Sequence, residues 1–148
     1  MHGVVLRPGR PDDAAEVTDI HDRARARFMS YLPIVHDEAD RLGYFARVLR
    51  DARVIIADAG TPIGFAAVAN GWLEHLYVLP ERVGQGVGSA LLRAALAGEG
   101  SLDLYVFQRN ERARRFYEAR GFTLVALTDG ADNEEREPDA HYRWAAPA

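Results

Sequence analysis

The sequence predicts a single α/β domain in which a mixed sheet is flanked by helices. Short apolar runs typical of strands alternate along the chain with segments whose apolar residues recur at helical spacing. The chain has 148 residues, a usual size for one domain with one hydrophobic core. No repeat, low-complexity tract or linker-like stretch divides it. We therefore expect one domain over residues 1–148.

The first half of the chain is predicted to form a strand, two helices and three further strands. Pro8 ends the first strand, and Asp12 and Asp13 place negative charge in the first turn of the helix that follows. Asn70 and Gly71 form a dipeptide typical of a tight hairpin turn. The predicted elements are a strand over 4–7, a helix opening at 11–13, a helix over 37–49, and strands over 54–57, 63–69 and 72–78.

The second half continues with two helix–strand units and a closing strand. Three glycines follow the strand over 72–78 and lead at once into a helix. Gly121 is placed to end the second of these helices. The predicted elements are a helix over 88–97, a strand over 102–107, a helix over 110–120, and strands over 122–127 and 142–145.

Composition excludes several classes of function. The formal net charge is −4, so no basic surface indicates nucleic acid or an anionic membrane as a partner. The absence of cysteine excludes thiolate catalysis and cysteine-based zinc sites, and the histidines lack metal-ligand spacing, so we expect no metal. No apolar run approaches about 18 residues, the length that suggests a membrane span, so we expect a cytoplasmic protein. All 18 basic residues are arginine, a bias that indicates a GC-rich bacterial genome.

The most informative stretch is the glycine-rich turn after the strand over 72–78. Gly84, Gly86 and Gly88 remove three side chains from one turn, so that backbone N–H groups can approach a ligand closely. The helix that starts there carries unpaired N–H groups and partial positive charge at its first turn. A strand, a bare turn and a helix N-terminus together favour a bound phosphate.

Two familiar phosphate motifs do not fit this turn. A P-loop needs a lysine after its last glycine, and the chain contains no lysine. A dinucleotide fingerprint needs the spacing Gly-x-Gly-x-x-Gly, whereas the glycines here alternate with single residues. An ordinary strand-to-helix turn would suit one glycine better than three.

Two segments together resemble the GNAT superfamily of acyl-CoA-dependent N-acetyltransferases. Residues 83–88, Val-Gly-Gln-Gly-Val-Gly, are similar to its signature Gln/Arg-x-x-Gly-x-Gly/Ala, with Val83 where Gln or Arg is usual. That departure removes a side-chain contact but no backbone N–H. Residues 110–122 contain every named position of the superfamily's block Asn-x-x-Ala-x-x-Phe-Tyr-x-x-x-Gly-Phe. With the opening Leu6-Arg7-Pro8, the resemblance covers nearly the whole chain.

The resemblance implies a fold and a cofactor. The fold is a mixed, mostly antiparallel sheet of about seven strands, splayed in the middle and flanked by about four helices. The cofactor is acetyl-CoA, with its diphosphate on the glycine turn and its pantetheine arm paired to a strand edge. The residues implied as cofactor-binding are Leu76, Tyr77, Val78, Val83, Gly84, Gln85, Gly86, Val87, Gly88, Ser89, Asn110, Ala113, Phe116 and Tyr117.

The resemblance also implies catalytic roles. The Val78 N–H would polarise the thioester carbonyl, and Tyr117 would protonate the departing thiolate, since a phenol titrates close to a thiol. The alternative for Tyr117 is an aromatic side chain packed between its helix and the sheet. Glu74 and His75 are candidates for the base that deprotonates the amine, and strand alternation predicts that they point to opposite faces. A solvated or structural role for both, with a water chain as the base, stays open.

The acceptor amine is less well defined by the sequence. The resemblance places one wall of its pocket between the first two helices, at Phe28, Tyr31 and His36, although loop packing explains these residues equally well. A second wall would come from the loop before the last strand, where Glu134 and Glu135 could attract a cationic amine or simply be solvated.

The predicted function is direct acetyl transfer from acetyl-CoA to a primary amine of a small molecule or peptide, by an enzyme that could form a homodimer. The alternative is a non-catalytic acyl-CoA-binding regulatory module on the same fold.

Overall fold

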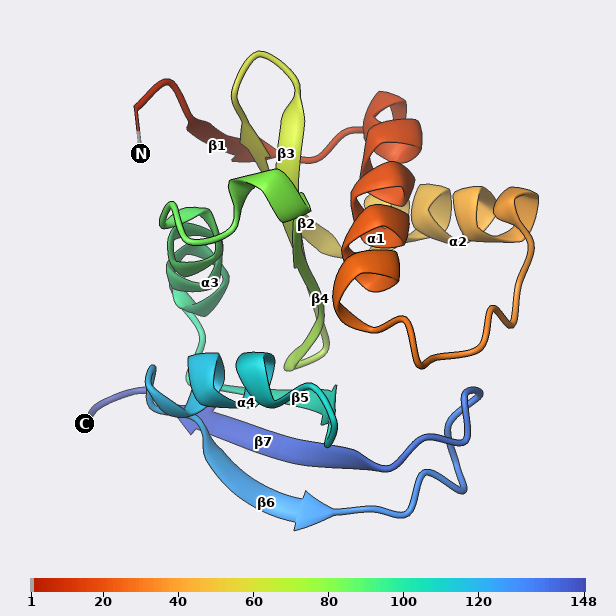
Figure 1. Cartoon of the computed structure of the whole chain (residues 1–148). Coiled ribbons are helices and arrows are strands. Elements are labelled where there is room, and N and C mark those ends of the chain that lie inside the picture. The colour runs from red at the N-terminus through yellow and green to blue at the C-terminus, as the bar shows by residue number, and fades with distance from the viewer. Residues whose placement is uncertain (1) are drawn as a thin grey trace.

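The computed structural model describes residues 2–148, which form a seven-stranded open sheet flanked by helices (Figure 1). This arrangement confirms the predicted fold class. The strand order is β1-β2-β3-β4-β5-β7-β6, and all pairs are antiparallel except the parallel pair β4–β5. The elements are β1 (Val5–Pro8), α1 (Ala14–Phe28), α2 (Glu38–Asp51), β2 (Arg53–Asp58), β3 (Pro62–Ala69), β4 (Trp72–Val78), α3 (Val87–Leu96), β5 (Ser101–Phe107), α4 (Glu111–Glu118), β6 (Thr123–Leu127) and β7 (Asp139–Ala145).

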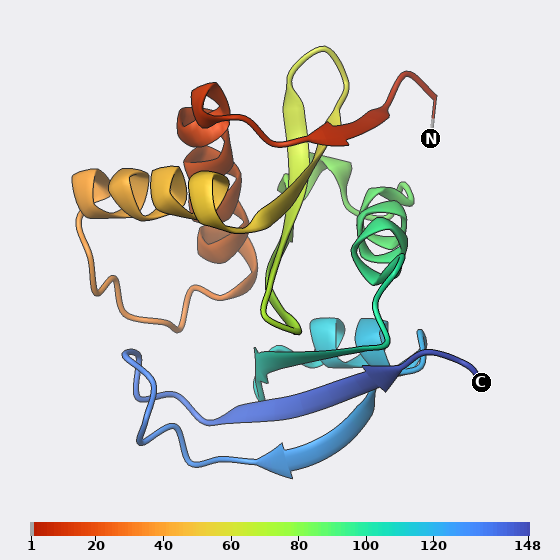
Figure 2. The same cartoon turned by 180° about the vertical axis from the view of Figure 1, so that it is seen from behind.

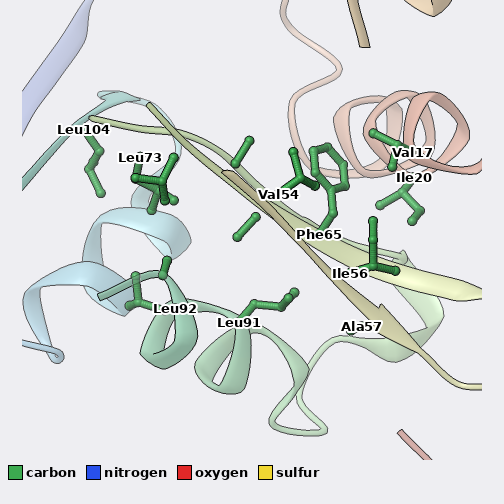
Figure 3. Close-up of a cluster of buried hydrophobic side chains, with 14 of the residues drawn as sticks. Val17, Ile20, Val54, Ile56, Ala57, Phe65, Leu73, Leu91, Leu92 and Leu104 are labelled. Carbon is green, nitrogen blue, oxygen red and sulfur yellow. The ribbon is translucent and has the colours of Figure 1, made fainter. Parts of the chain in front are cut away.

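The hydrophobic core lies on both faces of the strands β2 to β4. Helices α1 and α2 cover one face, and α3 covers the other (Figures 1 and 2). Phe65 of β3 is fully buried between them, with Ile20 of α1 and Leu91 of α3 on opposite sides of the strands (Figure 3). Burial on both faces explains why β3 reads as a continuous apolar run rather than an alternating one.

The turn between β3 and β4 follows directly from the sequence. Asn70 and Gly71 have φ angles of 54° and 80°, and two successive positive φ angles are what a type I′ hairpin turn needs. The last strand is longer than predicted, since β7 begins at Asp139 and pairs with Phe107 of β5 there. The first residues of β7 do not show the apolar pattern of a strand, so hydrophobic periodicity did not predict this part of it. Within residues 2–148, no helix combines the length and apolar character that crossing a membrane requires.

The sheet opens between β4 and β5. The two strands share a single bridge, between Trp72 and Asp103, where the Asp103 N–H donates to the Gly71 carbonyl at 2.9 Å. On its other side β4 stays paired with β3 as far as Val78, which lies opposite Gly64. Beyond residue 72, β4 therefore leaves β5 and runs with one free edge (Figure 1).

A β-bulge interrupts β4 within its pairing to β3. Ala67 pairs with His75 and Val68 pairs with Leu73, so that Glu74 is an extra residue without a partner. A bulge cancels the simple alternation of side chains along a strand. The alternation that predicted opposite faces for Glu74 and His75 is therefore interrupted at this point of the strand.

The loop between β6 and β7 is folded by its own side chains. The Asn133 amide donates to the Glu137 carbonyl at 2.7 Å, and its oxygen accepts from the Glu137 N–H at 3.1 Å. The Glu137 carboxylate in turn accepts from the Arg109 guanidinium at 2.6 and 2.8 Å. Gly130 packs beneath Glu137 with a φ angle of 81°. These contacts fix the path of the segment that carries Glu134 and Glu135.

We expect Gly130→Ala to destabilise the protein more than Gly60→Ala does. Both glycines have positive φ angles, so an alanine costs about 1–2 kcal/mol of backbone strain at either position. At Gly130 the new Cβ would also lie 2.4 Å from the carbonyl carbon of Glu137, whereas at Gly60 it meets nothing within 4 Å. Overpacking of this kind costs a further 1–3 kcal/mol, roughly. Urea unfolding of the two variants measures the difference, and equal losses would contradict the tight packing at Gly130.

Candidate active site

A cavity of about 590 Å³ occupies the place where β4 leaves β5. Four segments line it: the free edge of β4, the glycine turn with the start of α3, one face of α4, and the end of α1 with Met29. All but two of the residues predicted to bind the cofactor line it, namely Leu76, Tyr77, Val78, Val83, Gly84, Gly86, Gly88, Ser89, Asn110, Ala113, Phe116 and Tyr117. We call this space the smaller cavity.

The two exceptions lie elsewhere for clear reasons. Val87 is 1% exposed and belongs to the hydrophobic core beneath α3. The Gln85 side chain is exposed and donates to the Glu81 carbonyl at 3.4 Å, on the outer side of the turn. Neither side chain faces the smaller cavity, so each can contribute only backbone groups there.

The glycine turn leaves backbone donors uncovered. Gly84 and Gly86 have φ angles of 79° and 86°, which L side chains rarely adopt, and a Cβ added to either would meet nothing within 4 Å. Gly86 is also the N-cap of α3 and has no side chain to bond the first N–H groups of the helix. The start of α3 thus presents unpaired N–H groups beside an open surface.

The free edge of β4 carries a second donor. The Leu79 N–H donates to the Ile63 carbonyl of β3 at 2.9 Å. Because successive N–H groups of an extended strand point to opposite edges, the Val78 N–H points away from β3. It therefore faces the space into which β4 and β5 diverge.

Tyr117 lies on α4 where its ring reaches the smaller cavity. The ring is half-buried and packs edge-on against Phe116 and Phe122, with centroid distances of 5.3 and 5.4 Å. Burial raises the pKa of the Tyr117 phenol above its ordinary value, and neighbouring Tyr77 adds to the rise. The hydroxyl therefore stays protonated at neutral pH and has a proton to donate, as a weaker acid than a free phenol.

His75 is held inside an aromatic cluster on the α2 side of β4. Its Nε2 lies 2.7 Å from the Tyr44 hydroxyl, and its Nδ1 is buried without a hydrogen-bond partner. The ring packs 5.2 Å from Phe45, and burial lowers the pKa of His75 to about 3. The imidazole is thus neutral at physiological pH and a weak base.

Glu74 is the extra residue of the bulge in β4. Burial raises the pKa of Tyr44, and the Glu74 carboxylate adds to the rise. The Tyr44 hydroxyl is also hydrogen-bonded to His75. The predicted separation of Glu74 and His75 onto opposite faces stays a prediction, because the bulge interrupts the alternation on which it rested. Glu74 is exposed.

A larger cavity of about 1070 Å³ adjoins the first, and Met29 lines both. It is bounded by α1, α2, the loop between them and the loop before β7. Glu134 lies 2.9 Å from the His36 ring, and Glu135 pairs with Arg25 at 3.0 Å. The structure thus brings together the two segments predicted as walls of an acceptor pocket.

Phe28 and Tyr31 do not line this larger cavity. Phe28 lines the smaller one, with the Arg112 guanidinium 4.3 Å above its ring. Tyr31 lines neither, because its ring packs under the Arg109 guanidinium at 4.2 Å and its hydroxyl is buried. Loop packing, the alternative considered for these residues, describes Tyr31 better than an acceptor wall.

Sequence reasoning missed Arg112, Arg120 and Tyr44. A spacing of four residues separates Arg112, Phe116 and Arg120. Helical periodicity was therefore a signal that could have put the two arginines on the same side as Phe116. Nothing in the sequence pointed to Tyr44, which meets His75 only through the packing of α2 on the sheet.

Comparison with known proteins agrees with this arrangement. A family model of the GNAT acetyltransferase domain matches residues 50–124. The peptidyl-lysine N-acetyltransferase YiaC of Escherichia coli is 36% identical over 67 residues, which cover 45% of this chain and 46% of YiaC. The chain thus spans about half the length of this curated relative. An uncharacterized N-acetyltransferase of Archaeoglobus fulgidus is 30% identical over 127 residues, covering 70% of this chain and 86% of that protein.

Solved structures share the fold at lower identity. The apo form of YjaB from Escherichia coli superposes with a TM-score of 0.80 and 22% identity, over 97% of this chain and 99% of YjaB. The PaiA N-acetyltransferase of Thermoplasma acidophilum, solved in complex with coenzyme A, superposes with a TM-score of 0.70 and 18% identity, over 97% and 99% of the two chains. From the family model and the Archaeoglobus relative together, the chain belongs to the GNAT family of acetyltransferases.

Proposed function

We propose that this protein transfers an acetyl group from acetyl-CoA directly to a primary amine of a small molecule or peptide. The observation that carries the proposal is the smaller cavity, where uncapped helix N–H groups, a free strand edge and a protonated tyrosine face one space. The similarity to YiaC, a peptidyl-lysine N-acetyltransferase, supports an amine acceptor and favours a peptide.

The residues around the smaller cavity fit coenzyme A. Gly84, Gly86 and Gly88 offer backbone donors without side chains in the way, which suits a diphosphate. The unpaired edge of β4 at residues 76–78 suits a pantetheine arm, since its amides can pair with strand backbone. The cofactor, when bound, supplies the activated acetyl group as a thioester.

Two groups of the protein would act on the thioester. The Val78 N–H donates to the carbonyl oxygen, on which negative charge develops as the amine nitrogen attacks the carbonyl carbon. The new C–N bond forms as the C–S bond breaks, and Tyr117 gives its proton to the departing sulfur. The chain has no cysteine, so no thiol of the protein can accept the acetyl group on the way.

The proton of the amine goes to the open side of β4. His75 is a poor acceptor because its pKa is about 3 and its Nδ1 is enclosed. We assign this proton to water next to Glu74, the exposed carboxylate on the bulge. The Glu134 carboxylate in the larger cavity would attract the cationic form of the acceptor.

The second candidate function is a non-catalytic acyl-CoA-binding module. The weakness of His75 as a base favours this module. Within residues 2–148, His75 is the one histidine of β4, and it lines the larger cavity. Thiol release from acetyl-CoA with a panel of amines and lysine peptides separates the two. Release that depends on an amine supports the enzyme, and coenzyme A binding without release supports the module. A cytoplasmic location and a homodimer stay predictions.

We expect Tyr117→Phe to lower kcat by about 100-fold, a typical loss on removing a general acid. The affinity for acetyl-CoA should stay within about twofold, because the aromatic ring and its packing remain. Tyr105→Phe is the matched control, since this tyrosine is 56% exposed on β5 and lines neither cavity. Steady-state kinetics and calorimetry give the two readouts. A Tyr117→Phe enzyme with an unchanged kcat would remove the acid role.

We expect His75→Gln to leave the pH dependence of kcat/KM unchanged between pH 5 and 9. The folded protein protonates His75 only as the pH falls toward about 3, so its charge is constant over this range. Glu74→Gln serves as the comparison, because it removes the carboxylate that we place beside the proton-accepting water. An inflection near neutral pH that disappears only in His75→Gln would contradict the assignment and make the histidine the base.

A further inference from the structure

Arg120 joins the end of α4 to the start of α3. The residue follows the last turn of α4, and its Nη1 donates back to the Phe116 carbonyl at 3.0 Å. The guanidinium lies 3.8 Å from the centre of the Phe116 ring, and Nη2 donates to the Ser89 hydroxyl at 2.7 Å. Three contacts therefore hold this charge at the first turn of α3, directly after the glycine turn.

No carboxylate neutralises this guanidinium. Among the ion pairs within residues 2–148, none includes Arg120, although half of the chain's arginines form such pairs. No aspartate or glutamate lines the smaller cavity, where Arg112 and Arg120 are the charged lining residues. A fixed cation without a counter-charge at a cavity wall is an arrangement suited to an anion.

The glycine turn itself brings no charged side chain to this place. Val83 is apolar, and the Gln85 side chain bonds away from the cavity. Arg112 is eight residues from Arg120, about 12 Å along a helix, and stacks on Phe28 instead. The two guanidinium groups are therefore held by different contacts, and Arg120 is the one bonded to the start of α3.

We propose that Arg120, positioned by Ser89 and Phe116, binds the diphosphate of coenzyme A opposite the backbone N–H groups of the glycine turn. This inference rests on the proposed function, because it assigns a further contact to the same cofactor. In this arrangement Arg120 supplies the side-chain charge that the turn lacks. Ser89 is a positioning residue, since its hydroxyl accepts from the guanidinium.

The test compares three ligands by calorimetry with the wild type and Arg120→Ala. We expect Arg120→Ala to weaken coenzyme A by about 10- to 100-fold, the usual effect of losing a hydrogen bond to a charged group. Dephospho-coenzyme A should show the same loss, because it keeps the diphosphate and lacks only the 3′-phosphate. Pantetheine, which has neither, should bind both proteins equally. Arg120→Lys should recover part of the affinity.

Arg115→Ala is the matched control. Arg115 lies on the same helix, is exposed, and pairs at 3.9 Å only with Glu111 of that helix. It lines neither cavity, so its removal changes net charge equally but should alter coenzyme A affinity by less than twofold. Circular dichroism of each variant confirms that the fold is retained.

Two results would overturn the inference while leaving the proposed function intact. One is coenzyme A affinity within twofold of wild type for a folded Arg120→Ala. The other is a loss seen with coenzyme A but absent with dephospho-coenzyme A, which would move the contact to the 3′-phosphate. A wild-type protein that binds no coenzyme A even at millimolar concentration would overturn the proposed function itself, and with it this contact.

Discussion

The site depends on the opening of the sheet between β4 and β5. A strand inside a sheet uses both edges for hydrogen bonding, and a ligand cannot reach its backbone. Here the single bridge between Trp72 and Asp103 ends the pairing at the start of β4, while β3 continues to hold the other edge through Val78. Leaving peptide groups unpaired costs free energy. The strand keeps this conformation because the surrounding core fixes β4 from both faces. The free edge and the space beside it are thus parts of one arrangement.

The glycine turn matches this opening in a second way. Gly84 and Gly86 adopt positive φ angles that lead the chain from the 3-10 turn over Pro80–Arg82 into α3. The first N–H groups of α3 then lie at the mouth of the same cavity that the free edge of β4 lines. Backbone N–H groups of the turn and of β4 belong to the polar groups of the site, which explains how Val83 is compatible with it. Substituting one side chain in the turn leaves the N–H groups in place.

The sequence predicted the fold class, the order of the elements and the segments around the smaller cavity, because glycines and helical periodicity are local signals. It did not predict the bulge at Glu74, since an extra residue in a strand is defined by its pairing with β3. It left the role of Tyr31 open, since the packing of its ring under Arg109 arises from residues far apart in the chain. The periodicity of α4 could have indicated the position of Arg120. Its role as an anion ligand is inferred from the absence of a carboxylate partner, which only the packing of α4 against α3 reveals.

The two cavities differ in the charged side chains that line them. Arginines are the charged lining residues of the smaller cavity, whereas the larger one is lined by both signs of charge. Its carboxylates are Asp22, Asp40, Glu134 and Glu135, and its arginines are Arg25, Arg41 and Arg47. Several of these carboxylates are partly neutralised, since Asp22 pairs with Arg41 and Glu135 with Arg25. The Glu134 side chain is 63% exposed, and within residues 2–148 its one ion-pair partner is His36, so its charge is available to an incoming cation. A polyanionic cofactor and a cationic amine would therefore enter from different sides, and the two cavities meet at Met29, between the paths by which the reactants arrive.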